Sequence, residues 1–415
     1  MALTEEEKQY YLQQCKHILL YIAHCAWILI ISLSTLISIG LLLRFLRLKF
    51  GSRIKPSADR VIVITGATSG IGLALAKRFH RKGFTVFATH YNNQEPGYGE
   101  LSKIACERAT DSKAGQGAPR LFLVHMDVRS KQSIDVAATE IERLTAEFRL
   151  QLYCVICNAG VANESYFEIN KIENMETTIQ TNLLGVVLVA KRFILPIIKS
   201  KGRIVVTSSG LYGAITPPAP IYSPTKAAVK SFADCLNENL KRYGASCRNV
   251  VPGNLINKTN IMMSALRSFE DAVDRLSPEE RELYREAIEE NGRALRWQME
   301  LRVSQLGEDP KELADAYKVD LSAFNERKTT LVDRLYSFLD GSDNRKSKSS
   351  DSLGEMGALT AYDQAVCMKN PPRRCYCGNM SWQYITGPLV CEYTPQIVAT
   401  FLYHLVEDRL RGKVN

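Results

Sequence analysis

Residues 65–72 read Thr-Gly-Ala-Thr-Ser-Gly-Ile-Gly, and this stretch decides the fold of the chain. It follows the β-branched run 60–65 and precedes a helical pattern, so the segment predicts a strand, a glycine turn and a helix. We expect Gly66 to permit the tight turn, Gly70 to let the backbone approach a pyrophosphate, and Gly72 to let the helix pack on the sheet. The N-terminus of that helix would face the phosphates of a dinucleotide, whereas the alternative is an ordinary glycine turn.

The same alternation of short apolar runs and helical patterns recurs along the chain. Further strands are expected at 84–89, 121–126, 152–157, 203–207 and 246–251, and residues 92–119 are expected to be a surface excursion. The predicted fold class is α/β, a Rossmann-type doubly wound parallel sheet with helices on both faces. We predict a six-stranded core sheet in the order 3-2-1-4-5-6, with the outer edge of the sixth strand bare or covered by tail residues. A seventh strand should be absent or drawn from elsewhere. The candidate at 382–390 is interrupted by Gly and Pro, and only four residues follow the expected last helix at 394–411.

The composition of the 415 residues is that of a globular protein. The chain is 46% hydrophobic and 23% charged, which excludes a wholly disordered chain. Lys and Arg exceed Asp and Glu by 53 to 44, and this excess is too diffuse to indicate nucleic-acid binding. The chain has eleven cysteines, most of them single residues inside apolar segments, which favours reduced buried thiols over a disulfide framework.

The N-terminal segment 18–43 contains no Asp, Glu, Lys or Arg. At about 1.5 Å per residue it is long enough to cross a hydrocarbon core of about 30 Å, so it is predicted to be a transmembrane helix rather than a cleaved signal peptide. Basic residues are denser after this segment than before it. By the positive-inside rule, the remainder of the chain is expected to face the cytosol, with the endoplasmic reticulum as the expected membrane.

Composition and periodicity also predict the domain boundaries. The expected parts are an N-terminal tail (1–17), the transmembrane helix (18–43), a basic juxtamembrane linker (44–59), a Rossmann-type domain (60–260), a helical substrate lid (261–339), a flexible linker (340–353) and a C-terminal segment with the last helix (354–415). The lid is inferred from a densely charged helical pattern, and the linker from the absence of hydrophobic periodicity.

Tyr222 and Lys226 stand four residues apart in the sequence YSPTK, so both side chains are expected on one face of a helix. Hydride transfer at an alcohol carbon needs a base for the hydroxyl proton. A tyrosine, whose ordinary pKa is about 10, can serve near neutral pH only beside a cation, and Lys226 is placed to be that cation. Ser208 and Ser209 follow the strand 203–207, where a hydroxyl could hold the substrate oxygen.

From about residue 60 to 259 the chain resembles the short-chain dehydrogenase/reductase family. The motifs that carry this resemblance are the glycine motif 65–72, Asp127, the run Asn158, Ala159 and Gly160, Asn182 in TNLLG, Ser209, Tyr222, Lys226, and the pair Pro252 and Gly253. One departure is Cys157, where the family usually has an Asn that supports the backbone. Within the family, the chain is similar to the subgroup with hydroxysteroid, retinol and D-3-hydroxybutyrate dehydrogenases.

The resemblance implies a role for each of four catalytic residues. Tyr222 would be the general acid/base, Ser209 would orient the substrate oxygen, and Lys226 would bind the nicotinamide ribose. Asn182 would hold a proton-relay water.

The resemblance also implies a nicotinamide cofactor, with Asp127 and Asn158 on the adenine side. The expected cofactor-binding residues are Thr65, Gly66, Ser69, Gly70, Ile71, Gly72, Asp127, Asn158, Ala159, Gly160, Tyr222, Lys226, Pro252 and Gly253. Residues 88–92, after the second strand, offer neither the acid that would bind a ribose 2′-hydroxyl nor an Arg for a 2′-phosphate. We expect NAD(H) because the similar subgroup mostly uses it, and NADP(H) stays open.

The sequence therefore predicts a membrane-anchored oxidoreductase that transfers a hydride between NAD(H) and a lipophilic alcohol or ketone of the hydroxysteroid or retinol type. The alternatives are a D-3-hydroxybutyrate-type dehydrogenase and a catalytically silent, membrane-tethered nucleotide-binding scaffold. The expected partners are a small-molecule substrate, the membrane and, as an open possibility, a second copy of the chain. No metal is expected, because the tail cysteines at 367, 375, 377 and 391 have no common zinc spacing.

Overall fold

The structure is a computed structural model of the chain. It describes residues 51–110, 120–163, 165–213, 218–253, 259, 261–306 and 358–377, together with eight separate positions between 27 and 50. The chain divides into two units, Met1–Arg53 and Ile54–Asn415. The eight separate positions between 27 and 50 are helical and exposed. The rest of the predicted transmembrane helix 18–43 lies outside the described residues, so that helix stays a prediction.

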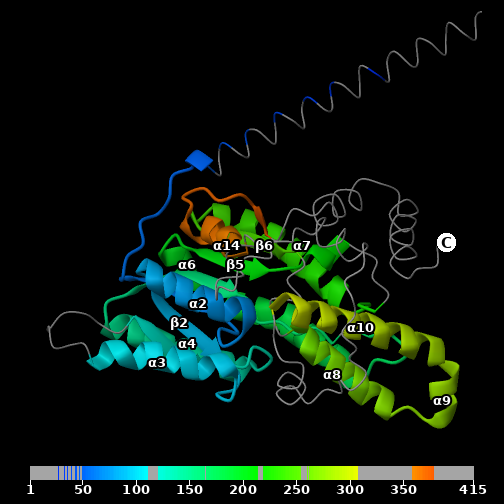
Figure 1. Ribbon diagram of the computed structural model, residues 1–415. Coiled ribbons are helices and arrows are strands. Elements are labelled where there is room, and N and C mark those ends of the chain that lie inside the picture. The colour runs from blue at the N-terminus through cyan, green and yellow to red at the C-terminus, as the bar shows by residue number, and fades with distance from the viewer. Residues whose placement is uncertain are drawn as a thin grey trace, which may run out of the picture. The chain divides into compact units, whose positions relative to one another are not determined.

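In the described part of the second unit, seven parallel strands form one sheet in the order β3-β2-β1-β4-β5-β6-β7 (Figure 1). The strands are β1 (Arg60–Ile64), β2 (Thr85–His90), β3 (Leu121–His125), β4 (Gln151–Cys157), β5 (Arg203–Thr207), β6 (Ser246–Pro252) and β7 (Arg374–Cys377). The order of the first six strands is the predicted one, and it is that of a Rossmann-type sheet.

The predicted six-stranded sheet is wrong, because the sheet has a seventh strand. β7 pairs in parallel with β6, with Asn249 opposite Arg374 and Pro252 opposite Cys377. The helix that precedes this strand is α14 (Ala358–Cys367), and the two tail segments considered from the sequence, 382–390 and 394–411, lie outside the described residues. The sequence pattern failed because β7 has only four residues, RCYC, and no apolar run of usual strand length.

Helices cover both faces of the sheet. They are α2 (Gly70–Lys82), α3 (Pro96–Thr110), α4 (Lys131–Glu147), α5 (Ile172–Ile179), a π-helical turn (Gln180–Leu184), α6 (Gly185–Lys199), a short 3₁₀ turn (Gly210–Gly213) and α7 (Tyr222–Lys241). Residues 62 and 64 of β1 pack with α2, α3 and α14, whereas residues 61 and 63 pack with α4, α6 and α7. This alternation follows from the two-residue period of a strand, and it produces the three-layer arrangement in Figure 1.

Ile172–Lys199, which comprises α5, the π-helical turn and α6, is the one described stretch long and apolar enough to cross a membrane. Inward-facing residues of α6, among them Val189 and Phe193, lie in the core beneath the sheet. Apolar side chains on this stretch therefore pack the interior of the globular unit.

Three further helices, α8 (Ile261–Asp274), α9 (Pro278–Leu283) and α10 (Arg285–Leu306), occupy part of the predicted lid. They form an apolar cluster of their own around Leu266 and Phe269, which also includes Ile169 from the loop after β4. Polar contacts join the same parts: the Tyr166 hydroxyl donates to Glu290 at 2.8 Å. The remainder of the predicted lid and the linker 340–353 lie outside the described residues.

The helix α14 is fixed to the sheet by buried polar contacts. Arg203 of β5 donates to the carbonyls of Ala365 and Met368, each at 2.8 Å, which caps the end of this helix. The Asp363 carboxylate, with only 5% of its side chain exposed, pairs with Arg78 and Lys82 of α2, each at 2.6 Å. These contacts hold the tail segment 358–377 against the sheet. In the sequence, this segment begins more than 100 residues after the end of β6.

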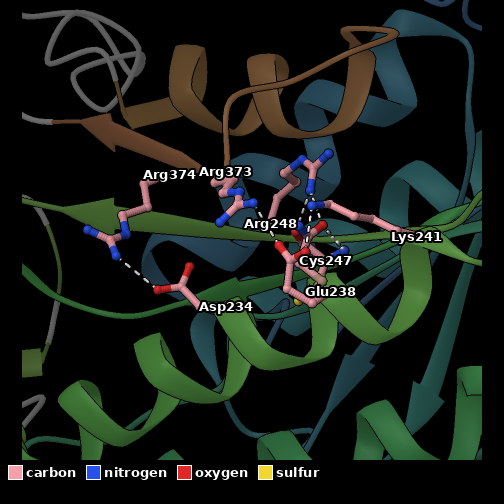
Figure 2. A network of polar contacts seen from close by, with 8 residues as sticks. Asp234, Glu238, Lys241, Cys247, Arg248, Arg373 and Arg374 are labelled. Carbon is pink, nitrogen blue, oxygen red and sulfur yellow. Dashed lines mark hydrogen bonds and ion pairs between the residues drawn. The ribbon is translucent and has the colours of Figure 1, made fainter.

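The strand β7 is attached to α7 by a network of ion pairs, shown in Figure 2. Arg374 pairs with Asp234 at 2.9 Å, and Arg373 pairs with Glu238 at 2.7 Å. Lys241 binds the same Glu238 at 2.6 Å. Because α7 begins with Tyr222, the network joins the tail to the helix that carries two of the predicted catalytic residues.

The replacement Asp363→Ala should destabilise the fold by about 1–3 kcal/mol, because it removes the buried acceptor shared by Arg78 and Lys82. This loss of stability should be smaller than for a fully buried ion pair, because Arg78 and Lys82 each keep about a quarter of the side chain exposed. Urea denaturation of the full-length chain in detergent measures it. Glu140→Ala, which removes an exposed ion pair to Arg143, is the control, and an equal loss in both variants would contradict the prediction.

Candidate active site

The described residues enclose a cavity of about 430 Å³ at the carboxyl ends of the strands. Each strand from β1 to β6 contributes a residue at or just after its end. Among the predicted site residues, those that line the cavity are Gly66, Ser69, Gly70, Ile71, Asp127, Asn158, Ala159, Gly160, Ser209, Tyr222, Lys226, Pro252 and Gly253. The structure therefore brings most of the predicted residues together, although they span almost 190 positions of sequence. Thr65, Gly72 and Asn182 lie behind the lining and hold it in place.

The glycine turn has the backbone shape that its sequence predicted. Gly66 and Gly70 have φ angles of +61° and +48°, a region that L side chains rarely adopt. A Cβ atom on Gly72 would lie 2.0 Å from the carbonyl oxygen of Gly66 and 2.7 Å from the Asn158 amide nitrogen. Gly72 thus allows α2 to press directly against the turn.

Thr65 and Asn158 bind the first turn to the fourth strand. The Thr65 hydroxyl accepts the backbone N–H groups of Asn158 and Ala159, each at 3.0 Å. The Asn158 side-chain amide donates to the carbonyls of Thr65 at 3.1 Å and Gly66 at 3.2 Å. These four bonds satisfy backbone groups where β1 and β4 end, and they fix the floor of the cavity.

The start of α2 fits the pyrophosphate of a dinucleotide. Ser69, Gly70 and Ile71 line the cavity at the first turn of this helix. Ser69 is the N-cap residue but makes no side-chain capping bond, and the first turn carries no acidic residue. The positive end of the helix dipole therefore faces the cavity with its amide groups available to an anion.

The predicted catalytic pair, Tyr222 and Lys226, lies on α7 with the expected one-turn spacing. Lys226 lies with its ammonium nitrogen 5.6 Å from the centre of the Tyr222 ring and donates to the carbonyl of Thr207 at 3.2 Å. Burial lowers the pKa of Lys226 to about 8, so the group is a cation at neutral pH that loses its proton more readily than an exposed lysine. Ser209 lies on the same cavity wall, and its side-chain oxygen accepts the Leu211 N–H at 3.2 Å.

Gly160 separates two of the predicted functional groups. A Cβ atom on this residue would lie 3.2 Å from the Asn182 side-chain oxygen and 3.4 Å from the Lys226 ammonium nitrogen. Asn182 itself is completely buried in the π-helical turn and exchanges two hydrogen bonds with the backbone of Val161, at 2.8 and 2.9 Å. It holds the segment after β4 from behind, and its role with a relay water stays a prediction.

The end of the cavity near Asp127, the predicted adenine end, contains charged residues that the sequence interpretation missed. Arg129 binds the Asp127 carboxylate through two contacts, at 2.9 and 3.0 Å, and lies 4.8 Å from the centre of the Tyr91 ring. Burial alone would raise the pKa of Asp127, but the hydrogen bonds from Arg129 outweigh it and lower that pKa. Glu95 also lines this end, and burial raises its pKa. No motif marks Glu95 in sequence, because it lies in the excursion 92–119.

The opposite end of the cavity has mixed polar and apolar walls. Residues from the segment after β4, α5, the π-helical turn, the 3₁₀ turn and α8 line it; they are Val161, Ala162, Thr177, Thr181, Leu211, Ile261 and Ser264. Lys226 is the one cation at this end among the described lining residues. The sequence interpretation missed these positions, because they belong to elements whose packing a linear pattern does not specify.

The replacement Gly72→Ala should lower stability by about 1–3 kcal/mol and weaken nucleotide binding, because its methyl group would collide with the Gly66 carbonyl oxygen. Gly99→Ala on α3 is the matched control, since a Cβ atom there meets nothing within 4 Å. That control should be neutral or slightly stabilising. Denaturation and nucleotide titration measure the two effects, and equal behaviour of both variants would show that the close approach at Gly72 is unimportant.

The chain belongs to the short-chain dehydrogenase family, whose family model, described as short chain dehydrogenase, matches residues 60–268. The match begins at β1 and ends within α8, so it contains the glycine turn and all the cavity-lining residues named above.

Several curated proteins are similar to this chain. The mitochondrial D-beta-hydroxybutyrate dehydrogenase of Bos taurus is 29% identical over 215 residues, covering 52% of this chain and 60% of that protein. Estradiol 17-beta-dehydrogenase 2 of Rattus norvegicus is 32% identical over 240 residues, which is 57% of each chain. Retinol dehydrogenase 16 of Homo sapiens is 27% identical over 248 residues, covering 60% of this chain and 73% of that protein. The chain thus spans about three fifths of the length of the first two relatives.

Proposed function

We propose that this protein is a nicotinamide-dependent alcohol dehydrogenase acting on a lipophilic alcohol or ketone. The observation that carries the proposal is the single cavity in which Ser209, Tyr222 and Lys226 lie beside the glycine turn. One wall offers an anion-binding helix start, and the other offers a hydroxyl, a phenol and an ammonium group. This is the set of groups that oxidation of an alcohol at a nucleotide requires.

A bound nicotinamide would supply the acceptor or donor of the hydride. Tyr222, through its phenolic oxygen, would take the hydroxyl proton of the alcohol, or return it in the reverse direction. The Lys226 ammonium group would favour the phenolate, and its bond to the Thr207 carbonyl keeps it on the cavity wall. The Ser209 oxygen already accepts one N–H, which leaves its own proton for the substrate oxygen.

A neutral substrate fits the lining better than a carboxylate. A hydroxy acid would need a cation for its carboxylate in addition to the one that assists Tyr222. Among the described lining residues, the cations are Lys226 and Arg129, and Arg129 is engaged by Asp127 at the adenine end. We therefore favour an alcohol of the hydroxysteroid or retinol type. The similarity to D-beta-hydroxybutyrate dehydrogenase keeps the hydroxy acid as the second candidate.

The replacement Tyr222→Phe should reduce turnover by at least about 10²-fold while nucleotide binding persists, because only the phenolic oxygen is removed. Turnover is measured with full-length protein, NAD⁺ or NADP⁺, and a panel of steroid alcohols, retinol and D-3-hydroxybutyrate. Tyr243→Phe, in the turn just after the same helix, is the control, since Tyr243 is half exposed and outside the cavity.

Near-normal turnover of the Tyr222 variant would remove the acid/base assignment. If the unaltered protein binds nucleotide but turns over no member of the panel, the result would favour the scaffold alternative instead. Turnover confined to D-3-hydroxybutyrate would favour the second candidate over a lipophilic alcohol.

We further propose that residues 18–43 anchor the protein in a membrane, with the catalytic unit in the cytosol. The proposal rests on the uncharged apolar run and on the basic residues that follow it. An anchored enzyme would draw a membrane-partitioned substrate from the bilayer to the cavity.

Protease added to sealed microsomes should digest the catalytic unit, because the positive-inside rule places everything after residue 43 on the cytosolic side. Immunoblotting against an epitope within the catalytic unit measures its survival. A lumenal marker protein is the control for sealed vesicles. Survival of the catalytic unit in sealed vesicles, with digestion only after detergent, would reverse the orientation.

A further inference from the structure

The adenine end of the cavity contains a carboxylate that lies outside every motif of the sequence. Glu95 is half-buried immediately before α3 and lines the cavity together with Tyr91, Ser69 and Gly70. It therefore stands between the end of β2 and the glycine turn. In a Rossmann-type fold this is the region of the adenosine ribose, because the pyrophosphate lies on the glycine turn.

Two further contacts fix the position of this carboxylate. The side-chain hydroxyl of Thr68, within the glycine turn, donates to Oε2 of Glu95. The backbone N–H of Gly97 donates to the Thr68 carbonyl at 3.1 Å, and a Cβ atom on Gly97 would lie only 2.2 Å from that oxygen. The start of α3 is thus pressed on the glycine turn, and Glu95 has a defined place beside it.

The contact to Thr68 uses one of the two carboxylate oxygens. The other, Oε1, has no hydrogen-bond donor among the described residues. An ionised carboxylate is purely an acceptor, and its two oxygens can accept up to about four hydrogen bonds. Glu95 can therefore hold Thr68 and accept a ribose hydroxyl at the same time.

The charges nearby disfavour a second phosphate at the ribose. Arg129 and Lys226 are the cations among the described residues that line the cavity. Arg129 is bound by both oxygens of Asp127, and Lys226 lies at the catalytic end. A 2′-phosphate would therefore meet the Glu95 carboxylate without an uncommitted cation to compensate it.

We propose that Glu95, held by Thr68, is the residue that selects NAD(H) over NADP(H), by accepting a hydrogen bond from the 2′-hydroxyl of the adenosine ribose and repelling a 2′-phosphate. The proposal rests on the proposed nicotinamide-dependent function and adds the residue that distinguishes NAD(H) from NADP(H). It assigns to the residue immediately before α3 the part that the residue directly after the second strand plays in the usual arrangement, because Tyr91 at that position carries no charge.

The test is a fluorescence titration of full-length protein with NADH and with NADPH, which requires no turnover. The unaltered protein should bind NADH at least about tenfold more tightly than NADPH, the scale of one charge-assisted hydrogen bond or one like-charge contact. Glu95→Gln keeps the size and the acceptor oxygen and removes the charge, so it should bring the two affinities within about threefold, chiefly by tightening NADPH.

Three more variants distinguish the effect of the Glu95 charge from the effect of the local structure around it. Thr68→Val removes the hydroxyl that holds Glu95, so it should reduce the preference while leaving the charge in place. Glu100→Gln, one turn further along α3, is the matched control: it pairs with Lys77 and does not line the cavity, and it should leave the preference unchanged. Glu95→Asp serves as a second charged variant and should retain a preference for NADH.

Equal affinity of the unaltered protein for both nucleotides would overturn the proposal, as would an undiminished preference in a Glu95→Gln variant that binds NADH normally. Loss of NADH binding in Glu95→Gln, with binding kept in Glu95→Asp, supports a hydrogen bond that needs the charge. If the unaltered protein binds neither nucleotide, the proposed function fails together with this assignment.

Discussion

The clamp between Thr65 and Asn158 is the interaction on which the rest of the site depends. It joins the glycine turn after β1 to the segment after β4, so the two parts of the sheet that line the cavity are held together at its floor. The Gly66 carbonyl that Asn158 holds is also the atom against which α2 packs at Gly72. A displacement of this carbonyl would move the N-terminus of α2, which faces the cavity, and with it the backbone amide groups that could bind an anion.

The side of the cavity that carries Lys226 is also held in place, by contacts from the tail of the chain. The Thr207 carbonyl accepts the Lys226 ammonium group, and the Thr207 hydroxyl lies 2.6 Å from the hydroxyl of Tyr362 on α14. Tyr362 is completely buried, so this contact is shielded from water. Together with the ion pairs in Figure 2, it makes the segment 358–377 part of the support for α7, although the lid and linker separate it from the other strands in sequence.

Local sequence patterns located the glycine turn, the six strands β1 to β6 and the pair Tyr222 and Lys226 because each depends on neighbouring residues. A two-residue alternation marks a strand, and a four-residue spacing marks one helix face, whatever the rest of the chain does. The observed strand bounds accordingly agree with the predicted ones within a residue. The same alternation places Cys154 and Cys157 on opposite faces of the sheet as free, buried thiols.

By itself, then, the sequence determined the class of fold, the position of the glycine turn and the residues that are proposed to react. Only the tertiary structure decided that the four-residue strand β7 completes the sheet, that Asn182 lies behind the cavity lining, and that Glu95 stands beside the glycine turn. Each of these depends on contacts between distant segments: β7 exists because β6 offers it an edge, and Glu95 is placed by α3 packing on Thr68. Such contacts carry no local periodicity, so only the assembled sheet and its helices specify them.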